Sequence, residues 1–334
     1  MNASLPISLG LDLVRCTETA ALAAGRWLGL ASPDEADQAA TSALLRVFDS
    51  VGLDGRIVIG EEGRLGSRAT ITSGQPMGNG SGPAADIVLD PIDGRTLLAL
   101  GHPDAISVIG AAPRGSMWCP LPAVYMEKIV VDAQVAEALV PECLDAPAAW
   151  TLALVARAKK KPVRDLVVFV LARFRHAELV REIRAAGARV LERFDGDIAG
   201  ALMAASGQKG VDVMMGVGGI PEGIIGACAV KALGGAMLGR LAPQSEAEEA
   251  AVRAAGLDTR HILTQDEIVT GQSTLFVATG ITDGAVLNGV QYEGQRARSN
   301  SLILRGEGRT RRLVFSEHLL EEQTAGDQTA NPVG

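Results

Sequence analysis

Two carboxylates, Asp90 and Asp93, stand three residues apart in an Asp-Pro-Ile-Asp-Gly run that follows an apolar segment. The run predicts a strand ending near Asp90, a turn made rigid by the proline, and a helix opening after Gly94, where backbone N–H groups would approach an anion. Hard divalent cations prefer such oxygen ligands, and a metal there would polarise a phosphate and activate a water. The run therefore indicates a metal and phosphate site, although an ordinary acidic turn would carry the same residues.

Composition and charge narrow the class of protein. The chain has 334 residues, of which 47% are hydrophobic, so it is long enough for one large core or two modest ones. Its formal net charge of −8 argues against broad nucleic-acid binding. Four cysteines lie far apart without a Cys-x-x-Cys pair, which is typical of reduced thiols in a cytoplasmic protein. We see no export signal and no apolar run of membrane-spanning length, and expect neither secretion nor membrane insertion.

Periodicity predicts α/β structure along most of the chain. Apolar residues at helical spacing predict a helix over 11–30, and a second helix is expected to begin near Ser32, capped by the serine hydroxyl. A strand over 56–60 would deliver Glu61 to a loop. Strands over 105–112 and 123–131 are expected in the first sheet. Beyond residue 165 strands and helices alternate, which predicts a second sheet covered by helices: strands 166–171, 189–192 and 211–216, and helices 177–186, 197–205 and 221–233.

Short motifs spread along the chain resemble those of the class II fructose-1,6-bisphosphatases, some of which also act on sedoheptulose-1,7-bisphosphate. The resemblance extends from about Gly10 to Arg312. It rests on ordered segments at residues 13–18, 57–61, 90–94, 105–108, 125–128, 195–197, 216–223 and 278–284. Kinship of this kind implies a fold, whereas activity has to be argued from the site.

The resemblance implies a layered α/β/α/β/α sandwich with the metal site between two regions that each contain a sheet. We expect residues 1–155 to form a metal-binding and catalytic α/β region, and residues 156–321 to form a second α/β region that completes the sugar-phosphate site. The polar segment 322–334 is expected to be a disordered tail. A homodimer or homotetramer is also expected from the family.

The resemblance also implies a metal site. In the family, Mg²⁺ or Mn²⁺ is held by acids that match Asp37, Glu61, Asp90, Asp93 and Glu222 of this chain. Taken singly, Asp37 or Glu61 would more often be a solvated charge. The presence of the whole set favours ligands for one or two ions, which would activate a water for in-line attack on the phosphate.

A sugar phosphate is the implied small-molecule partner, and most of the family's substrate contacts have counterparts here. Arg173 and Arg175 match a phosphate-binding pair whose guanidinium forks suit a phosphate, with Phe174 in place of the usual proline. The other expected contacts are Gly94 and Gly219 through the backbone, Arg95, the hydroxyl of Tyr125, and Asp195 and Asp197 as acceptors for sugar hydroxyls.

Three departures from the family fall at the expected catalytic centre. Arg95 replaces a threonine thought to orient the attacking water, and a guanidinium that stays protonated cannot act as a base. Pro33 and Asp34 stand where the family has a lysine, and Gly63 and Leu65 replace two acids of the loop after Glu61. The groups expected to take part in catalysis are Asp90, Asp93, Arg95 and Glu61.

Two functions remain open at this point. In the first, the chain is a metal-dependent phosphatase of a sugar phosphate, in which Arg95 contacts the phosphate and the substrate differs from that of the family. In the second, it is a weak or silent paralogue that keeps the pocket as a binding or regulatory module. A third alternative is a relative of inositol monophosphatase, which would share the Asp-Pro-x-Asp-Gly motif. The segments 216–223 and 279–284 fit the bisphosphatase class better.

Overall fold

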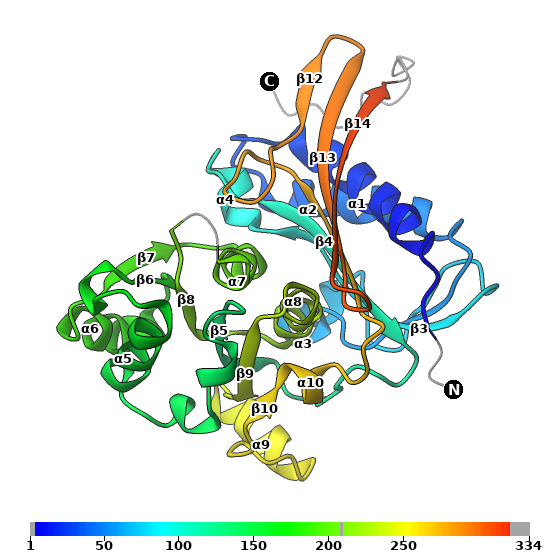
Figure 1. Cartoon of the computed structure of the whole chain (residues 1–334). Coiled ribbons are helices and arrows are strands. Elements are labelled where there is room, and N and C mark those ends of the chain that lie inside the picture. Colours follow the sequence, from blue (N-terminus) through cyan, green and yellow to red (C-terminus); the bar gives the residue numbers. More distant parts are fainter. Residues whose placement is uncertain (1–3, 208–209, 321–334) are drawn as a thin grey trace.

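The chain forms five layers, in which two mixed β-sheets alternate with three layers of helices (Figure 1). The computed structural model describes residues 4–207 and 210–320. Within these residues the layered α/β sandwich is the architecture that the sequence predicts. The tail expected over 322–334 lies outside the described residues.

In the described part of the chain, one sheet has eight strands in the order β12-β13-β11-β4-β3-β1-β2, with β14 paired to β13. Its outer face is covered by helix α1 (Leu9–Gly25), which packs against α2 (Pro33–Phe48). Leu13 and Leu44 of these helices share one core with Ile87 and Ile109 of the sheet. The strands are β1 (Asp54–Ile57), β2 (Pro76–Met77), β3 (Ala84–Asp93), β4 (Ile106–Pro113), β11 (Leu275–Gly280), β12 (Gln291–Glu293), β13 (Arg296–Arg305) and β14 (Thr310–Leu319).

The other sheet, again counted over the described residues, has six strands in the order β10-β9-β5-β8-β6-β7. Helices α5 (Ala148–Lys159) and α6 (Ala177–Ala185) supply the core on its outer face. The strands are β5 (Tyr125–Val131), β6 (Val167–Leu171), β7 (Arg189–Arg193), β8 (Val213–Gly219), β9 (Ala236–Leu241) and β10 (Leu263–Thr264). Short helices complete the chain: α3 (Glu62–Leu65), α4 (Arg95–Ala99), α9 (Glu246–Ala254) and α10 (Gln265–Ile268).

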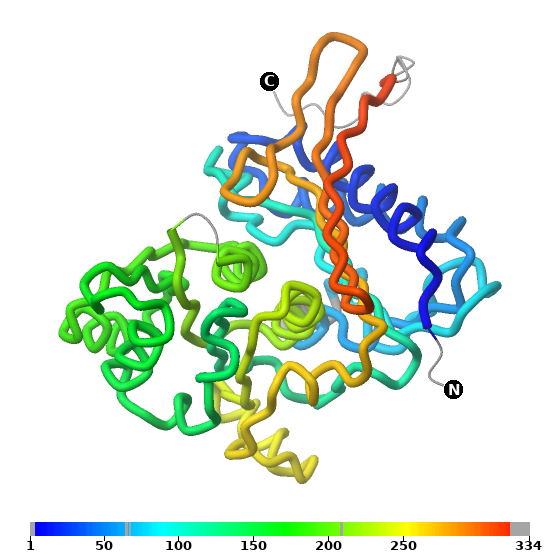
Figure 2. The backbone as a smooth tube through the Cα atoms, viewed as in Figure 1, coloured from blue at the N-terminus to red at the C-terminus, as the bar shows by residue number. Residues whose placement is uncertain are grey.

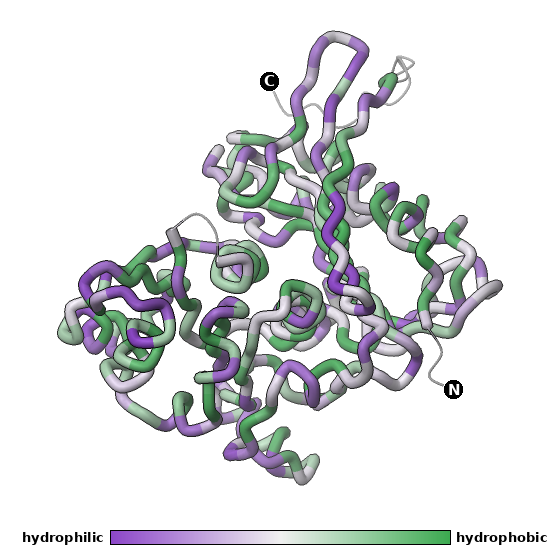
Figure 3. Tube along the Cα trace, viewed as in Figure 1, coloured by the Kyte–Doolittle hydropathy of each residue, from purple (hydrophilic) through white to green (hydrophobic). Residues whose placement is uncertain are grey.

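Two helices fill the space between the sheets. Helix α7 (Asp197–Ser206) and helix α8 (Ile220–Leu233) pack against each other and against strands of both sheets. Helix α8 is buried on nearly every side, which requires a helix without a polar face. Hydrophobic segments gather in the sheets and these inner helices, whereas the loop between β12 and β13 is hydrophilic (Figure 3).

The two sheets are interleaved along the sequence. Strand β5 belongs to the second sheet, so the expectation that segment 123–131 lies in the first sheet is wrong. Strands β11–β14 return to the first sheet, beside the N-terminal helix α1 (Figure 2). The predicted division after residue 155 therefore does not coincide with the division between the sheets.

Most predicted elements occur close to their expected positions, with two local differences. Helix α1 ends at Gly25 rather than Leu30, and the chain turns before α2. Ser32 precedes α2, but its side chain makes no capping hydrogen bond, so the predicted cap is wrong. Pro33 occupies the first turn instead, where its missing N–H leaves no unsatisfied donor.

Two further findings concern the chemistry of the whole chain. All four cysteines lie in the described part and are free thiols, as expected; burial raises the pKa of Cys16 and Cys228 to about 12. No helix among the described residues has the length and apolar character needed to cross a bilayer.

Candidate active site

The Asp-Pro-Ile-Asp-Gly run forms the end of β3 and the entry to α4. The strand continues through Asp93, with a shift in its pairing to β4 between Asp90 and Asp93. Asp90 Oδ1 accepts the Ile92 N–H at 3.0 Å, which holds the backbone at this irregularity, so the turn expected after Asp90 is wrong. Gly94 has a φ of 99°, a conformation that side chains rarely adopt, and helix α4 begins at the next residue. The local sequence thus presents two acids and Arg95 at one edge of the sheet.

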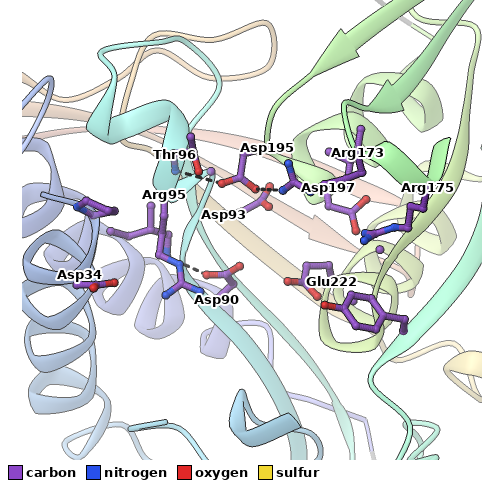
Figure 4. A pocket seen from close by; sticks show the side chains of 17 residues that line it. Asp34, Asp90, Asp93, Arg95, Thr96, Arg173, Arg175, Asp195, Asp197 and Glu222 are labelled. Carbon is purple, nitrogen blue, oxygen red and sulfur yellow. Dashed lines mark hydrogen bonds and ion pairs between the residues drawn. The ribbon is translucent and has the colours of Figure 1, made fainter. Parts of the chain in front are cut away.

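A cavity of about 330 Å³ opens at this edge and is lined from both sheets and from α2, α4, α7 and α8 (Figure 4). Every predicted site residue except Asp37 and Glu61 lies on its wall. These are Asp90, Asp93, Gly94, Arg95, Tyr125, Arg173, Arg175, Asp195, Asp197, Gly219 and Glu222. Segments more than 130 positions apart in the sequence therefore meet in one polar pocket.

Asp37 and Glu61 lie beside the pocket and both contact Arg95. The Nη1 atom of Arg95 is 3.3 Å from Asp37 Oδ2, and its Nη2 atom is 3.7 Å from Glu61 Oε1. The side chain of Glu61 is only 6% exposed, and that of Arg95 is 24% exposed. The arginine that replaces the family's threonine thus links the two acids to the pocket wall.

Asp93 is buried against the N-terminus of α7. Its Oδ2 atom accepts the backbone N–H groups of Ile198 and Ala199, each at 3.0 Å. Burial and the nearby Asp90, Asp195 and Asp197 raise the pKa of Asp93 well above its usual range, although the bond from Ala199 opposes them. Without a cation, the surroundings of Asp93 therefore favour its protonated form.

The two acids at the start of α7 have separate partners. Asp195 Oδ2 accepts the Thr96 N–H at 3.1 Å, and Asp197 Oδ2 lies 2.5 Å from Lys128 Nζ. Burial raises the pKa of Asp197, and the charge of Lys128 opposes that rise. Thr96 itself lines the pocket, one position after Arg95. Asp197 Oδ1 has no hydrogen-bond partner among the described residues, so one buried acceptor is available to a ligand hydroxyl.

The opposite wall carries the two predicted phosphate-binding arginines. Arg173 donates to the Phe194 carbonyl and lies 3.8 Å from Asp195. Arg175 donates to the Val217 carbonyl at 3.0 Å, and its guanidinium lies 5.2 Å from the centre of the Tyr125 ring. Burial, with Arg173 nearby, lowers the pKa of Arg175. Backbone and ring contacts therefore hold both guanidinium groups in place before any anion binds.

His176 anchors this arginine segment to β8. Its Nε2 atom accepts the Val217 N–H at 2.8 Å, so Nδ1 carries the proton and donates to the Leu171 carbonyl at 2.7 Å. Burial lowers the pKa of His176 and favours this neutral form. The sequence interpretation assigned no role to His176 or to Lys128. Lys128 is the only cation of the otherwise mostly apolar strand β5, which is a signal that could have been used.

The paired glycines at the end of β8 make room for acids. A Cβ atom at Gly218 would lie 2.0 Å from Asp197 Oδ2, and one at Gly219 would lie 2.0 Å from Glu222 Oε2. We expected Gly219 to let the backbone approach a ligand. The structure shows a further steric reason: only glycine leaves the Glu222 carboxylate its position at the start of α8.

Of the other two departures, the one at Pro33 and Asp34 lies at the pocket, whereas Gly63 lines a separate cavity. Pro33 and Asp34 line the pocket, so an acid and a proline face the space where the family has a lysine. Gly63 lies against the side chain of Val124. The side chain of Leu65 is outside the described part. Arg95 is thus the cation that the chain presents on this side of the cavity (Figure 4).

The predicted acids differ in how well they fit a divalent ion. Asp90, Asp93 and Glu222 are hard oxygen donors that line the cavity, and the repulsion between Asp90 and Asp93 favours a cation. The guanidinium of Arg95 contacts Asp37 and Glu61 and is also joined to Asp90 (Figure 4), so it competes with a metal ion for these acids. Over the described ranges, no three His, Cys, Asp or Glu side chains converge closely enough to enclose a metal. The three pocket acids would therefore have to move together around an ion.

Comparison of the sequence with known proteins shows the family of the chain. Residues 7–318 match the family described as bacterial fructose-1,6-bisphosphatase, glpX-encoded. The chain belongs to this family. The class 2 fructose-1,6-bisphosphatase of Haemophilus influenzae is 35% identical over 328 residues, which cover 94% of this chain and 97% of that protein. Fructose-1,6-bisphosphatase 1 class 2 of Escherichia coli K12 is 34% identical over 328 residues, which cover 94% of this chain and 96% of its own length.

Membership of the family bears on the alternatives that the sequence left open. The match to the bisphosphatase family over nearly the whole chain confirms the resemblance, and sets aside a closer kinship with inositol monophosphatase. The relatives are named as enzymes, and nothing in the comparisons supports a regulatory module. Fructose bisphosphatases of this family depend on divalent metals.

Proposed function

We propose that the protein hydrolyses a phosphate ester of a sugar bisphosphate, with fructose-1,6-bisphosphate as the first candidate substrate. The observation that carries this proposal is one pocket lined by both cations and acids, with Arg173 and Arg175 across the cavity from Asp90 (Figure 4). The cations suit a bound phosphate, and the acids suit the polar chemistry of its cleavage. The family of the chain supports the same reaction.

Each wall of the pocket has a proposed task. Arg173, Arg175 and the Tyr125 hydroxyl bind one phosphate, because they are donors held in place before binding. Asp195 and Asp197 accept hydrogen bonds from sugar hydroxyls. Gly94 supports this arrangement through its backbone conformation, and Gly219 by leaving space for Glu222.

The acids at the end of β3, Asp90 and Asp93, are proposed as catalytic groups that act by holding a cation. Burial raises the pKa of Asp93 when no cation is present, and a bound cation would keep both carboxylates ionised. Mg²⁺ or Mn²⁺ is proposed at Asp90, Asp93 and Glu222, where it would supply charge to polarise the phosphate. Arg95 adds a permanent positive charge on the same side of the cavity.

We also propose an oligomeric state and a location for the protein. A homodimeric or homotetrameric state is proposed from the family resemblance. A cytoplasmic location is supported by the four free thiols, which are typical of a reducing compartment.

The test is phosphate release from a panel of sugar monophosphates and bisphosphates in the presence of Mg²⁺ or Mn²⁺. We expect release from at least one bisphosphate, and a loss of about 10²-fold or more in Asp90→Asn. Arg181→Ala is the control, because this exposed arginine pairs with Glu178 on α6, away from the pocket. Release no faster than that of Asp90→Asn on every substrate would overturn the proposal.

A further inference from the structure

Strand β14 lies at an edge of the first sheet and leaves one of its own sides open. In the described part of the chain it pairs with β13 alone, over its full length from Thr310 to Leu319 (Figure 1). The strand contains neither proline nor glycine, so nothing in its sequence interrupts a second ladder of hydrogen bonds. Its free side therefore offers a row of N–H and C=O groups, which is a template for pairing with another strand.

One face of β14 is also apolar and uncovered. The odd-numbered side chains lie on the side of the inner helices, and among them Leu313, Phe315 and Leu319 are 48%, 73% and 78% exposed. The even-numbered side chains are partly buried on the other face, where Val314 packs against the core below α1. Single exposed apolar side chains are common, but three on one face of an edge strand indicate a contact surface.

A cavity of about 180 Å³ opens beside this face, between β14 and the inner helices α7 and α8. Apart from Ser206 and Arg311 its wall is apolar, and it includes Leu202 of α7, Leu233 of α8 and Leu313 of β14. Leu313 thus belongs both to the cavity and to the exposed strand. An apolar side chain on a strand added beside β14 would lie next to Leu313, at the mouth of the cavity.

We propose that β14 of a second copy of the chain pairs antiparallel with this edge, so that the first sheets of two copies become one. A twofold axis perpendicular to the joined sheet keeps like faces on the same side. Odd-numbered residues of one copy must therefore stand opposite odd-numbered residues of the other. Only registers centred on a residue, rather than between two residues, satisfy this condition.

The side chains select the register centred on Val314. Leu313 then stands opposite Phe315 of the second copy and Arg311 opposite its Glu317, and the twofold axis repeats both pairs. A register centred on Leu313 would set Arg311 opposite Phe315, and one centred on Phe315 would set Leu313 opposite Glu317. Apolar pairs and pairs of opposite charge stabilise neighbouring strands, so the self-complementary register is favoured.

The charged pair fits the exposure of its two members. Arg311 is exposed and makes no ion pair with any described residue. Glu317 contacts Arg296 and Arg298 of its own chain, but its side chain is still 44% exposed, and a carboxylate has about four acceptor sites. Exposed charges of this kind determine register more than affinity. The affinity would come from Phe315 of each copy, which lies over the cavity of the other.

The inference rests on the oligomeric state proposed above and names its surface, and it makes no assumption about the reaction. A dimer would use the β14 edge alone. A tetramer would need a second surface in addition, since pairing through one edge strand closes after two copies.

The first experiment measures the mass of the full-length protein by sedimentation velocity at several concentrations. We expect a dimer or tetramer, and expect Phe315→Glu to halve that mass and weaken association about 10²-fold or more, because its carboxylate would be buried against Leu313. Trp150→Glu is the matched control, since this aromatic residue is 47% exposed on α5, outside the second sheet. Circular dichroism verifies folding. A monomeric parent, or Phe315→Glu with the parent's mass, would overturn the proposal.

The second experiment tests the register with two charge reversals. Arg311→Glu alone and Glu317→Arg alone should each associate about tenfold more weakly than the parent, because each sets like charges opposite each other twice. Mixing the two variants should restore association as a heterodimer, in which both cross-strand pairs join opposite charges. A tag on one variant identifies the heterodimer by its mass.

Contacts of position 317 within its own chain are the same in the homodimer and the heterodimer, so they cancel in this comparison. A mixture that associates no better than the separate variants would contradict the proposed pairing. This comparison also decides if Phe315→Glu does not fold.

Neither experiment measures phosphate release, so the two proposals can fail separately. Association through β14 without hydrolysis of any sugar phosphate would overturn the proposed function alone. Hydrolysis by a chain that stays monomeric would overturn the role of β14 alone.

Discussion

Lys128 Nζ lies 2.5 Å from Asp197 Oδ2, and the two side chains are 3% and 7% exposed. Lys128 comes from β5 and Asp197 from α7, so this buried ion pair joins the second sheet to the inner helix layer. Removing one partner leaves a buried charge without compensation, which is costly.

Lys128→Met is therefore expected to lower the free energy of unfolding by about 3–5 kcal/mol. Denaturant titration of the metal-free protein measures this loss. Arg253→Ala breaks an exposed pair with Glu249 and should cost less than about 1 kcal/mol. Equal effects of the two changes would mean that the buried pair contributes no more than a surface pair.

His176 predicts a pH dependence of stability. Burial holds its pKa below the ordinary value of 6.5, so the folded protein binds fewer protons here than the unfolded chain. The contribution is fully present above the unfolded pKa and is lost as pH falls below about 6.5 towards the folded pKa. His176→Gln, which does not titrate, should show a flatter profile over this interval in urea titrations. His261→Gln, at an exposed histidine, is the control. A profile for His176→Gln that parallels the parent's would contradict the prediction.

Gly219→Ala tests whether metal binding depends on the space that Gly219 leaves beside the Glu222 carboxylate. The backbone at Gly219 has φ −69° and ψ 153°, which alanine adopts without strain, so any effect comes from the methyl group. That methyl would lie 2.0 Å from Glu222 Oε2 and should displace the carboxylate. We expect Mn²⁺ affinity to fall by about tenfold or more.

Gly226→Ala provides a matched control for this change in α8. Its added methyl would meet only the Cβ of Ala201, at an ordinary 3.6 Å. The substitution should leave Mn²⁺ binding unchanged and stabilise the helix by up to about 1 kcal/mol. If Gly219→Ala behaved like Gly226→Ala, the steric argument for the paired glycines would be wrong.

Arg175→Lys separates charge from geometry in phosphate binding. Lysine keeps the positive charge but loses the planar fork that donates to Val217 and stacks on Tyr125. We expect the affinity for a sugar bisphosphate to fall by about 1.5–3 kcal/mol, measured by calorimetry. Lys160→Arg, the reverse exchange outside the pocket wall, should have no effect. Unchanged binding in Arg175→Lys would show that charge alone suffices.

Local features of the fold could be predicted because neighbouring residues determine them. Apolar periodicity located the strands β1 and β3–β8 and the helices α1, α2, α6, α7 and α8, whereas the elements beyond α8 were not predicted. The turn expected at Pro91 was wrong, because β3 continues through Asp93 and the chain turns at Gly94. The assignment of β5 to a sheet was not predictable, because pairing depends on partners far away in the sequence. The return of β11–β14 to the first sheet has the same cause.

The sequence by itself determined which chemical groups are present: the acids, the arginine pair, and an arginine in place of a threonine at position 95. Only the tertiary structure decided how they are grouped. Asp37 lies on α2, Arg95 on α4 and Glu61 just before α3, and α4 packs against α2. Charge pairing depends on distance and burial, and neither quantity can be read from spacing along a chain.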